Sequence, residues 1–61
     1  MARNNPAMGA KVRAIRQRND MTQVALAEEL DISASYLNLI EHGRRPLPAH
    51  LLIKLSQVFD V

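Results

Sequence analysis

Two short segments with helical periodicity lie on either side of a break of only three residues, Asp31–Ile32–Ser33. The first segment, Gln23–Leu30, follows Thr22, and the second segment, Ala34–His42, follows Ser33. Threonine and serine are favoured N-cap residues, so each segment has its own start signal. Two short helices joined by so tight a break must cross steeply. The crossed pair predicts an all-α fold.

The small and apolar residues of this pair indicate how it is held together. Ala27 lets the two backbones approach, and Ile32 fills the angle between them. Leu37 and Ile40 face the first helix. Asp31 follows the first helix at a position where left-handed backbone is common, and aspartate tolerates that region better than most residues. The second helix is therefore fixed by one face and presents the other outward.

Helical periodicity also precedes the pair. A helix is expected to run to about Asn19, with Met8, Val12 and Ile15 on one face. Gly9 makes the start of this helix uncertain, because an interior glycine costs about 1 kcal/mol.

A further helix follows the pair. Gly43 ends the second helix of the pair as a left-handed residue, and a loop then leads to a helix from about Pro48 to Phe59. We expect its buried stripe to contain Leu51, Leu52, Leu55, Val58 and Phe59.

The size and composition of the chain exclude several classes of protein. Sixty-one residues make one domain at most, and a catalytic cleft needs more scaffold, so an enzyme is nearly excluded. Cysteine is absent and the two histidines have no carboxylate near both in sequence, so neither a metal site nor a cofactor is expected. No apolar run can span a membrane, and residues 1–8 lack a secretory signal, which favours a cytoplasmic location.

Charge is distributed unevenly along the chain. Residues 1–18 carry five basic and no acidic side chains, whereas residues 19–41 carry five acidic and no basic ones. Residues 42–61 carry three basic side chains and one acidic one. A basic end of this kind can meet phosphate, although a solvated helix surface explains the same charges.

The run TQVALAEELDISASYLNLIEHGRRP resembles the helix-turn-helix of phage Cro proteins, lysogeny repressors and their bacterial relatives. The resemblance depends on Thr22–Gln23, the L-A-x-x-L run, Ile32, Ser33 and the segment Ile40–Arg44. More narrowly, the chain is similar to the N-terminal domain of larger bacterial regulators that respond to short-chain fatty acids.

This resemblance implies a lambda-repressor-like helical bundle. The family fold usually has five helices, whereas four are expected here, which leaves the apolar side of the last helix partly uncovered. Residues 1–7 would then form a flexible arm, and residues 8–61 the DNA-binding domain, with its helix-turn-helix unit at 22–42.

The resemblance also implies the surface that meets DNA. Helix 34–42 would enter the major groove as the recognition helix. Its outward face is short-chained and free of charge, and the candidate base-contacting residues are Ala34, Ser35, Asn38 and Leu39. Alanine and leucine can contact a thymine methyl group, while asparagine can read adenine or hold a phosphate. The absence of Arg or Lys on this face argues against strong guanine reading.

Phosphate contacts are expected around this helix. The candidates are Thr22, Gln23, Tyr36, Arg44 and Arg45. By the resemblance, Gln23 binds a phosphate and braces the start of the recognition helix. Each candidate also has a purely structural explanation: Thr22 as a cap, Tyr36 as a packing residue, and the arginines as complements to a helix C-terminus. The resemblance further implies a structural ion pair between Arg16 and Glu41.

These observations predict sequence-specific binding to double-stranded DNA by a transcriptional regulator, as a homodimer on a palindromic operator. An effector-binding domain would lie C-terminal to this chain. The alternative is a protein-interaction module, similar to an antitoxin, that uses the apolar face of the last helix at Leu51, Leu55, Val58 and Phe59.

Overall fold

A computed structural model describes residues 6–60, which form four α-helices without a strand. The helices are α1 (Pro6–Arg18), α2 (Gln23–Leu30), α3 (Ala34–Glu41) and α4 (Ala49–Phe59). The predicted all-α fold is confirmed. Of the predicted arm 1–7, residues 1–5 lie outside the described residues, and Pro6 and Ala7 are already part of α1.

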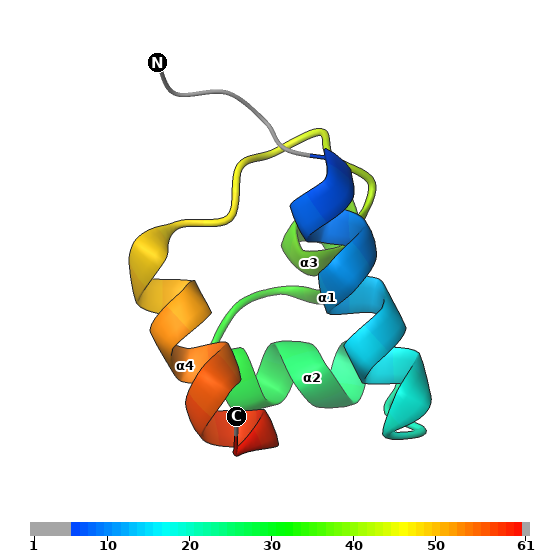
Figure 1. Cartoon of the computed structure of the whole chain (residues 1–61), viewed down its shortest axis with the longest axis vertical. Helices are drawn as coiled ribbons and strands as arrows, with labels where there is room; N and C mark the ends of the chain where they lie inside the picture. The colour runs from blue at the N-terminus through cyan, green and yellow to red at the C-terminus, as the bar shows by residue number, and fades with distance from the viewer. Residues whose placement is uncertain (1–5, 61) are drawn as a thin grey trace.

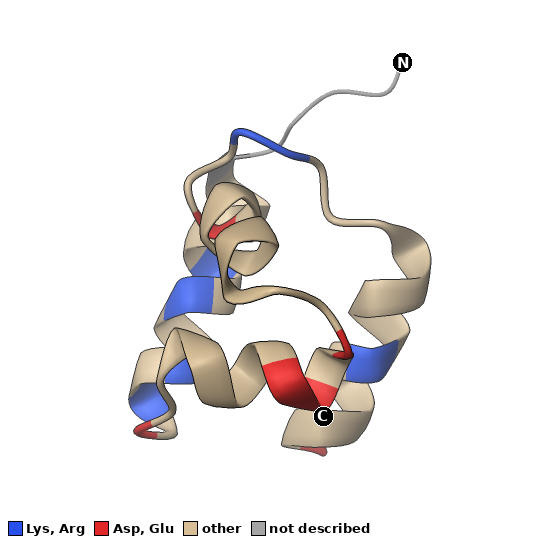
Figure 2. Cartoon of the chain, turned by 180° about the vertical axis from the view of Figure 1, so that it is seen from behind, with Lys and Arg blue, Asp and Glu red and all other residues tan. Residues whose placement is uncertain are grey.

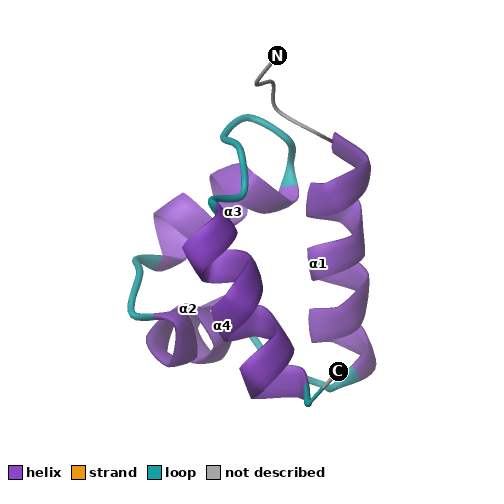
Figure 3. Ribbon diagram, turned by 60° about the vertical axis from the view of Figure 1, so that its left-hand side comes forward, coloured by secondary structure: helices purple, strands orange, loops and turns teal. Residues whose placement is uncertain are grey.

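The helices pack around one core (Figure 1). α3 packs against both α1 and α2, and α4 packs against α2. In Figure 3, α4 lies in front of the α2–α3 pair and α1 stands to one side. Side chains of α1 and α4 line one common groove, so these two helices are neighbours that together support the helix-turn-helix pair.

Local capping explains where α2 and α3 begin. Thr22 Oγ1 accepts a hydrogen bond from the backbone N–H of Ala25 at 3.0 Å. Ser33 Oγ accepts from the N–H of Tyr36 at 3.0 Å. Each cap satisfies one of the backbone donors that the first turn of a helix leaves without a partner. Both predicted starts are therefore correct.

The ends of α2 and α3 share one backbone pattern. Asp31 has φ 60° and Gly43 has φ 74°, both in the left-handed region that the sequence predicted for them. Beyond α2, the N–H of Ile32 donates to the carbonyl of Ala27 at 3.0 Å. Beyond α3, the N–H of Arg44 donates to Leu39 at 2.8 Å. In each case the hydrogen bond closes a span of six residues and satisfies a backbone carbonyl in the last turn of the helix. α3 ends at Glu41, one residue before the predicted end, and His42 caps it.

The core is built from the faces that the helical periodicity assigned to it. Its most deeply buried side chains are Leu26, Leu30, Leu37, Ile40 and Leu51. Val12 from α1 and Leu55 from α4 complete it. All four helices contribute buried side chains to this core, so the stability of each helix depends on its packing against the others.

The predicted stripe of α4 needs correction at Leu52. Leu51 and Leu55 are buried, and Val58 and Phe59 are partly buried, but Leu52 is 48% exposed. Leu51, Leu55 and Val58 recur at the three- and four-residue spacing of one helix face, whereas Leu52 is turned about 100° from Leu51. It therefore lies at the edge of the stripe. Beside it, α1 and α4 border an apolar groove of about 150 Å³.

Gly9 is buried where α1 crosses the end of α3. A Cβ atom at this position would overlap the carbonyl oxygen of Ile40 and lie 2.9 Å from that of Glu41. The glycine thus permits contact between a helix and a neighbouring backbone. It is a packing requirement of the α1–α3 crossing, and α1 continues through it.

Candidate nucleic-acid interface

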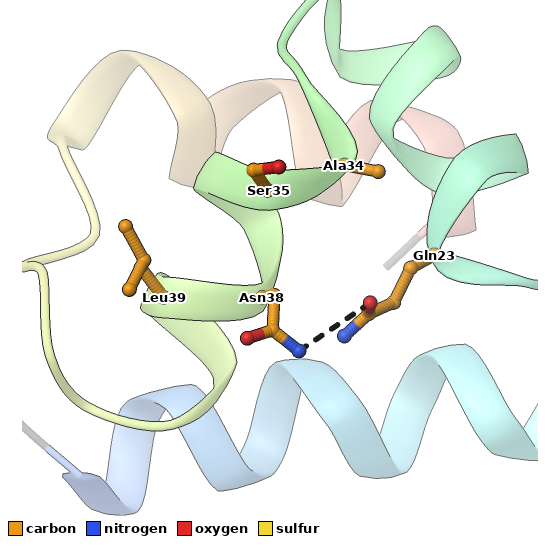
Figure 4. Close-up of a pocket in the computed structure, with 5 residues that line it drawn as sticks. All are labelled: Gln23, Ala34, Ser35, Asn38 and Leu39. Carbon is orange, nitrogen blue, oxygen red and sulfur yellow. Dashed lines mark hydrogen bonds between the residues drawn. The ribbon is translucent and has the colours of Figure 1, made fainter.

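The outward face of α3 forms one wall of an open depression (Figure 4). Four α3 residues and one α2 residue line it: Ala34, Ser35, Asn38, Leu39 and Gln23. Its volume is about 440 Å³. The sequence had predicted these four α3 residues as a group, and the structure places them together on one surface. Ser35 and Asn38 are exposed, while Ala34 and Leu39 are partly buried.

The opposite face of α3 is anchored. Leu37 and Ile40 are each 1% exposed in the core. Ser33 caps the first turn, and Gly43 closes the last. A helix with a packed face and two fixed ends holds its outward side chains in a defined position, which is what reading a rigid surface requires.

A buried ion pair joins α1 to the end of α3. Arg16 Nε donates to Glu41 Oε2 at 2.7 Å, and Arg16 Nη2 donates to Glu41 Oε1 at 3.0 Å. The Glu41 side chain is fully buried and that of Arg16 is 12% exposed. Arg16 Nη1 also donates to the carbonyl of Met21 at 2.9 Å. The arginine therefore binds three acceptors and ties the end of α1 to α3.

Gln23 connects this pair to the depression. Its Nε2 donates to Glu41 Oε1 at 3.0 Å, and its Oε1 accepts from Asn38 Nδ2 at 3.5 Å (Figure 4). Asn38 lies in the middle of α3, and Glu41 is its last residue. Gln23 also lines the depression together with Ala34 and Ser35, at the start of α3.

The remaining phosphate candidates surround α3. Thr22 is exposed at the start of α2 with its hydroxyl oxygen used as a cap. Tyr36 is partly buried and packs against the core. Arg44 and Arg45 are exposed in the loop after α3. Of these residues, Thr22, Arg44 and Arg45 are exposed, at the start of α2 and in the loop after α3, and none of the four lines the depression.

Charge separates along the molecule (Figure 2). Lys and Arg lie along α1, in the α3–α4 loop and at Lys54 of α4, whereas Glu28, Glu29 and Asp31 gather at the C-terminal end of α2. The acidic residue within the α3 region is Glu41, which is buried against Arg16. The exposed charged side chains that follow α3, Arg44 and Arg45, are basic, which suits an anionic partner.

Comparison of the sequence with known protein families assigns the chain to one of them. Residues 12–61 match the helix-turn-helix family. The chain belongs to this family.

Relatives of the helix-turn-helix chain include much longer proteins. The HTH-type transcriptional regulators PrpR and RamB of Mycobacterium tuberculosis are 45% and 46% identical to it over 53 and 54 residues. A propionyl-CoA carboxylase regulator of Cereibacter sphaeroides is 42% identical over 53 residues. The alignments cover 87–88% of this chain but only 11–12% of those proteins. The chain is thus similar, over most of its length, to a short segment of larger bacterial regulators, as the narrower resemblance predicted.

A solved helix-turn-helix structure has the same fold. The crystal structure of the clp gene regulator ClgR from C. glutamicum matches with a TM-score of 0.84 and 30% identity. The match covers 92% of this chain and 72% of that one. This similarity is consistent with the lambda-repressor-like arrangement of the helices.

The helix-turn-helix unit depends on two residues to which the sequence analysis assigned no such role. Gly9 allows the α1–α3 contact, and Lys54 Nζ donates to the carbonyl of Leu30 at 3.5 Å, at the end of α2. In the sequence, the one indication that Gly9 faces the core is that it directly follows Met8, a residue of the apolar face of α1. Within residues 6–60 no three His, Asp or Glu side chains gather as metal ligands, and no helix is long and apolar enough to cross a membrane.

Proposed function

We propose that this helix-turn-helix domain binds specific sequences of double-stranded DNA in a transcriptional regulator, with α3 as the recognition helix in the major groove. The observation that carries the proposal is the rigid, uncharged outward face of α3, bordered by exposed arginines. The major groove admits one helix, and bases there are distinguished by short polar and apolar side chains.

The residues lining the depression are the base-contacting set. Ser35 and Asn38 offer hydrogen-bonding groups, and Ala34 and Leu39 offer methyl groups to thymine. Serine both donates and accepts, so it discriminates less than asparagine. The combination favours A·T pairs over G·C pairs at the positions under α3.

The rim residues position the helix on the backbone. Arg44 and Arg45 donate to phosphates beside the groove, and the start of α2 brings Thr22 and Gln23 to the neighbouring phosphate. One Nε2–H of Gln23 is donated to Glu41, which leaves its second N–H for a phosphate oxygen. Tyr36 adds its hydroxyl. These contacts fix register and carry no base preference themselves.

The chain acts as a homodimer on a palindromic operator. One domain makes few base contacts, and a second copy on the same duplex raises affinity through effective concentration. Because the relatives are much longer, an effector-binding domain C-terminal to this unit belongs to the same proposal. A regulator of transcription acts on the chromosome, so we place the protein in the cytoplasm and assign it no catalytic role.

Selection from a random pool of DNA duplexes at two salt concentrations tests this function. We expect a palindromic motif among the bound duplexes and an affinity that falls steeply as salt rises. Salt-sensitive binding without an enriched motif would remove the sequence-specific part of the proposal. No binding at low salt would remove all of it.

The protein-interaction alternative receives less support. It required Leu51 and Leu55 as an exposed working surface, but these side chains are only 1% and 7% exposed and belong to the core. The exposed large apolar residues of α4 are instead Leu52 and Ile53. Two exposed side chains on one helix are common in monomeric proteins.

A further inference from the structure

His42 directly follows α3, and its ring is hydrogen-bonded to the backbone of that helix. Its Nδ1 lies 2.8 Å from the backbone carbonyl oxygen of Asn38, which also accepts from the backbone N–H of His42 at 3.1 Å. A carbonyl oxygen can only accept, so this contact requires a hydrogen on Nδ1. The contact therefore selects one tautomer, in which Nδ1 carries the hydrogen in the neutral ring as well as in the charged one.

This tautomer decides what the other ring nitrogen offers. Nε2 of the neutral ring has a lone pair and accepts, whereas Nε2 of the charged ring has a hydrogen and donates. His42 is exposed, so this nitrogen is the polar group of the ring that a partner can reach. Gain of one proton therefore changes His42 from an acceptor into a cationic donor, while the bond to Asn38 holds the ring in place.

His42 lies at the edge of the proposed DNA surface. It follows Asn38, which lines the depression, by four residues, and residues four apart share one face of a helix. In the proposed docking the first residues of α3 meet base edges, so its last turn comes to the sugar–phosphate backbone. Arg44 and Arg45, which we propose as phosphate contacts, come directly after His42 and Gly43 in the chain.

The charged groups around His42 show which anion could favour a proton on its ring. The acidic side chain of α3, Glu41, is fully buried in an ion pair. The acidic side chains of α2, Glu28 and Glu29, lie in its last turn, whereas Gln23, which contacts the end of α3, is its first residue. The charged side chains of α1, which packs against α3, and of the following loop are all basic: Lys11, Arg13, Arg16, Arg18, Arg44 and Arg45. The anion that favours the charged ring therefore has to come from the partner.

A DNA phosphate is such an anion. The neutral ring would set its Nε2 lone pair against phosphate oxygens, which accept, whereas the charged ring would donate a charge-assisted hydrogen bond. The C-terminal end of a helix also carries a partial negative charge, so a phosphate near the end of α3 is repelled unless a cation lies between them. Both effects favour the charged ring more in the DNA complex than in the free domain.

We propose that His42 is a proton-dependent phosphate contact: its ring, held by the Asn38 carbonyl, takes up one proton when the domain binds DNA and donates Nε2–H to a backbone phosphate beside the end of α3. The inference rests on the proposed DNA-binding function and adds to it a dependence of affinity on pH. Affinity rises as the pH falls through the range in which histidine titrates, about pH 8 to about pH 5.

The test measures the affinity of four proteins for one duplex that the wild-type chain selects. Fluorescence anisotropy gives the affinity at about pH 8 and about pH 5.5 and at several salt concentrations, a range in which unperturbed carboxylates stay ionised. The variants are His42→Gln, which is neutral at both pH values, and His42→Lys, which is charged at both. His50→Gln removes the other histidine, in α4, and is the matched control. Circular dichroism at both pH values establishes that each protein is folded.

We expect the wild-type affinity to rise by about three- to tenfold from about pH 8 to about pH 5.5, as one charged hydrogen bond at an exposed site provides. The slope of log affinity against log salt concentration should steepen by about one, because one more phosphate is neutralised. His50→Gln should keep both changes. His42→Gln should lose most of both, and His42→Lys should bind more tightly than the wild type at about pH 8.

Three results would overturn the inference while leaving DNA binding intact. One is an equal gain in affinity for the wild type and His42→Gln, which would assign the proton to another group. Another is a gain that disappears in His50→Gln. The last is a gain without a steeper salt slope, since the proton would then not serve a phosphate contact. Failure of the wild type to bind any duplex at either pH rejects the proposed function itself, and the inference with it.

Discussion

Glu41 combines a full charge with complete burial, which a small protein tolerates only when the charge is paired. Its two oxygens receive three hydrogen bonds, from Arg16 and Gln23. The pair joins residues 25 positions apart in the sequence and fixes α1 against the end of α3. Stability and the geometry of the recognition face therefore depend on the same side chains.

Removing one member of the pair should unfold the domain. Arg16→Met leaves Glu41 buried without its cation, which costs about 3–5 kcal/mol, as much as a core of this size contributes. The double variant Arg16→Met/Glu41→Met leaves no buried charge and should be more stable than the single variant. Urea unfolding followed by circular dichroism measures the wild type, Arg16→Met, Glu41→Met and the double variant. A double variant whose loss equals the sum of the two single losses would contradict the coupling.

Gly9→Ala should destabilise the domain, although alanine is the better helix former by about 1 kcal/mol. The added methyl group would collide with two carbonyl oxygens of α3, and overpacking against backbone costs about 1–3 kcal/mol. Thermal unfolding should show a melting temperature lower by about 5–15 °C. Ala10→Gly, at an exposed site of the same helix, is the control and should lower stability through helix propensity alone. An increase in melting temperature for Gly9→Ala would mean that the helices do not approach this closely.

At the scale of elements, the helices end in a similar way but with different residues. Asp20, Asp31 and Asp60 follow α1, α2 and α4 with φ between 55° and 60°, where only Gly43 follows its helix as a glycine. Left-handed backbone is strained for any residue with a side chain. A carboxylate near a helix C-terminus also meets the negative end of the helix dipole. These ends carry two small unfavourable terms that glycine would remove.

Asp31→Gly should therefore stabilise the α2–α3 turn. The stabilisation from relieved backbone strain and from the lost negative charge should exceed the entropic cost of ordering a glycine. We therefore expect the free energy of unfolding to rise by about 0.5–1 kcal/mol. Asp31→Ala removes the same charge but keeps a Cβ atom, and alanine tolerates left-handed backbone less well than aspartate, so the added strain should cancel the gain from the lost charge. Thermal melts of the two variants and the wild type, measured in parallel, separate the contribution of backbone strain to stability from that of the charge. Equal gains from both variants would assign the effect to charge alone.

At the scale of the whole molecule, the arrangement of charge matters more than its sum. Two arginines lie in the α3–α4 loop beside α3, while Glu28, Glu29 and Asp31 gather at the C-terminal end of α2 (Figure 2). In the proposed function, this distribution would favour approach to DNA with α3 foremost. Net charge alone, +2, would not give this orientation.

Two charge-matched variants test whether this orientation governs binding. Arg45→Gln removes a cation beside α3 and should reduce the slope of log affinity against log salt concentration by about one. Lys54→Gln removes the same charge at the α2 end, where the side chain donates to Leu30, and should leave the slope unchanged. Filter binding or fluorescence anisotropy at several salt concentrations gives both slopes. Equal reductions would show that only total charge counts.

The sequence was sufficient for the starts of α2 and α3 and for the left-handed residues that follow them, which neighbouring residues decide. Thr22 and Ser33 predicted the starts of α2 and α3, and Asp31 and Gly43 predicted their ends, because caps and left-handed turns are satisfied within a few residues. The 3.6-residue period likewise placed the candidate base-contacting residues on one face of α3.

Tertiary structure decided what depends on residues far apart in the chain. Periodicity did not exclude Leu52 from the buried stripe, because Leu52, Leu55 and Phe59 also recur at helical spacing. The position of the neighbouring helix determines where the stripe ends. Gly9 appeared to weaken α1 until the backbone of α3 lay against it. The partners of Gln23 came from α3, and they give that residue an orientation that no local pattern contains. Local hydrogen bonds fix where helices begin and end, whereas side-chain burial and polarity depend on which surfaces the packed helices bring together.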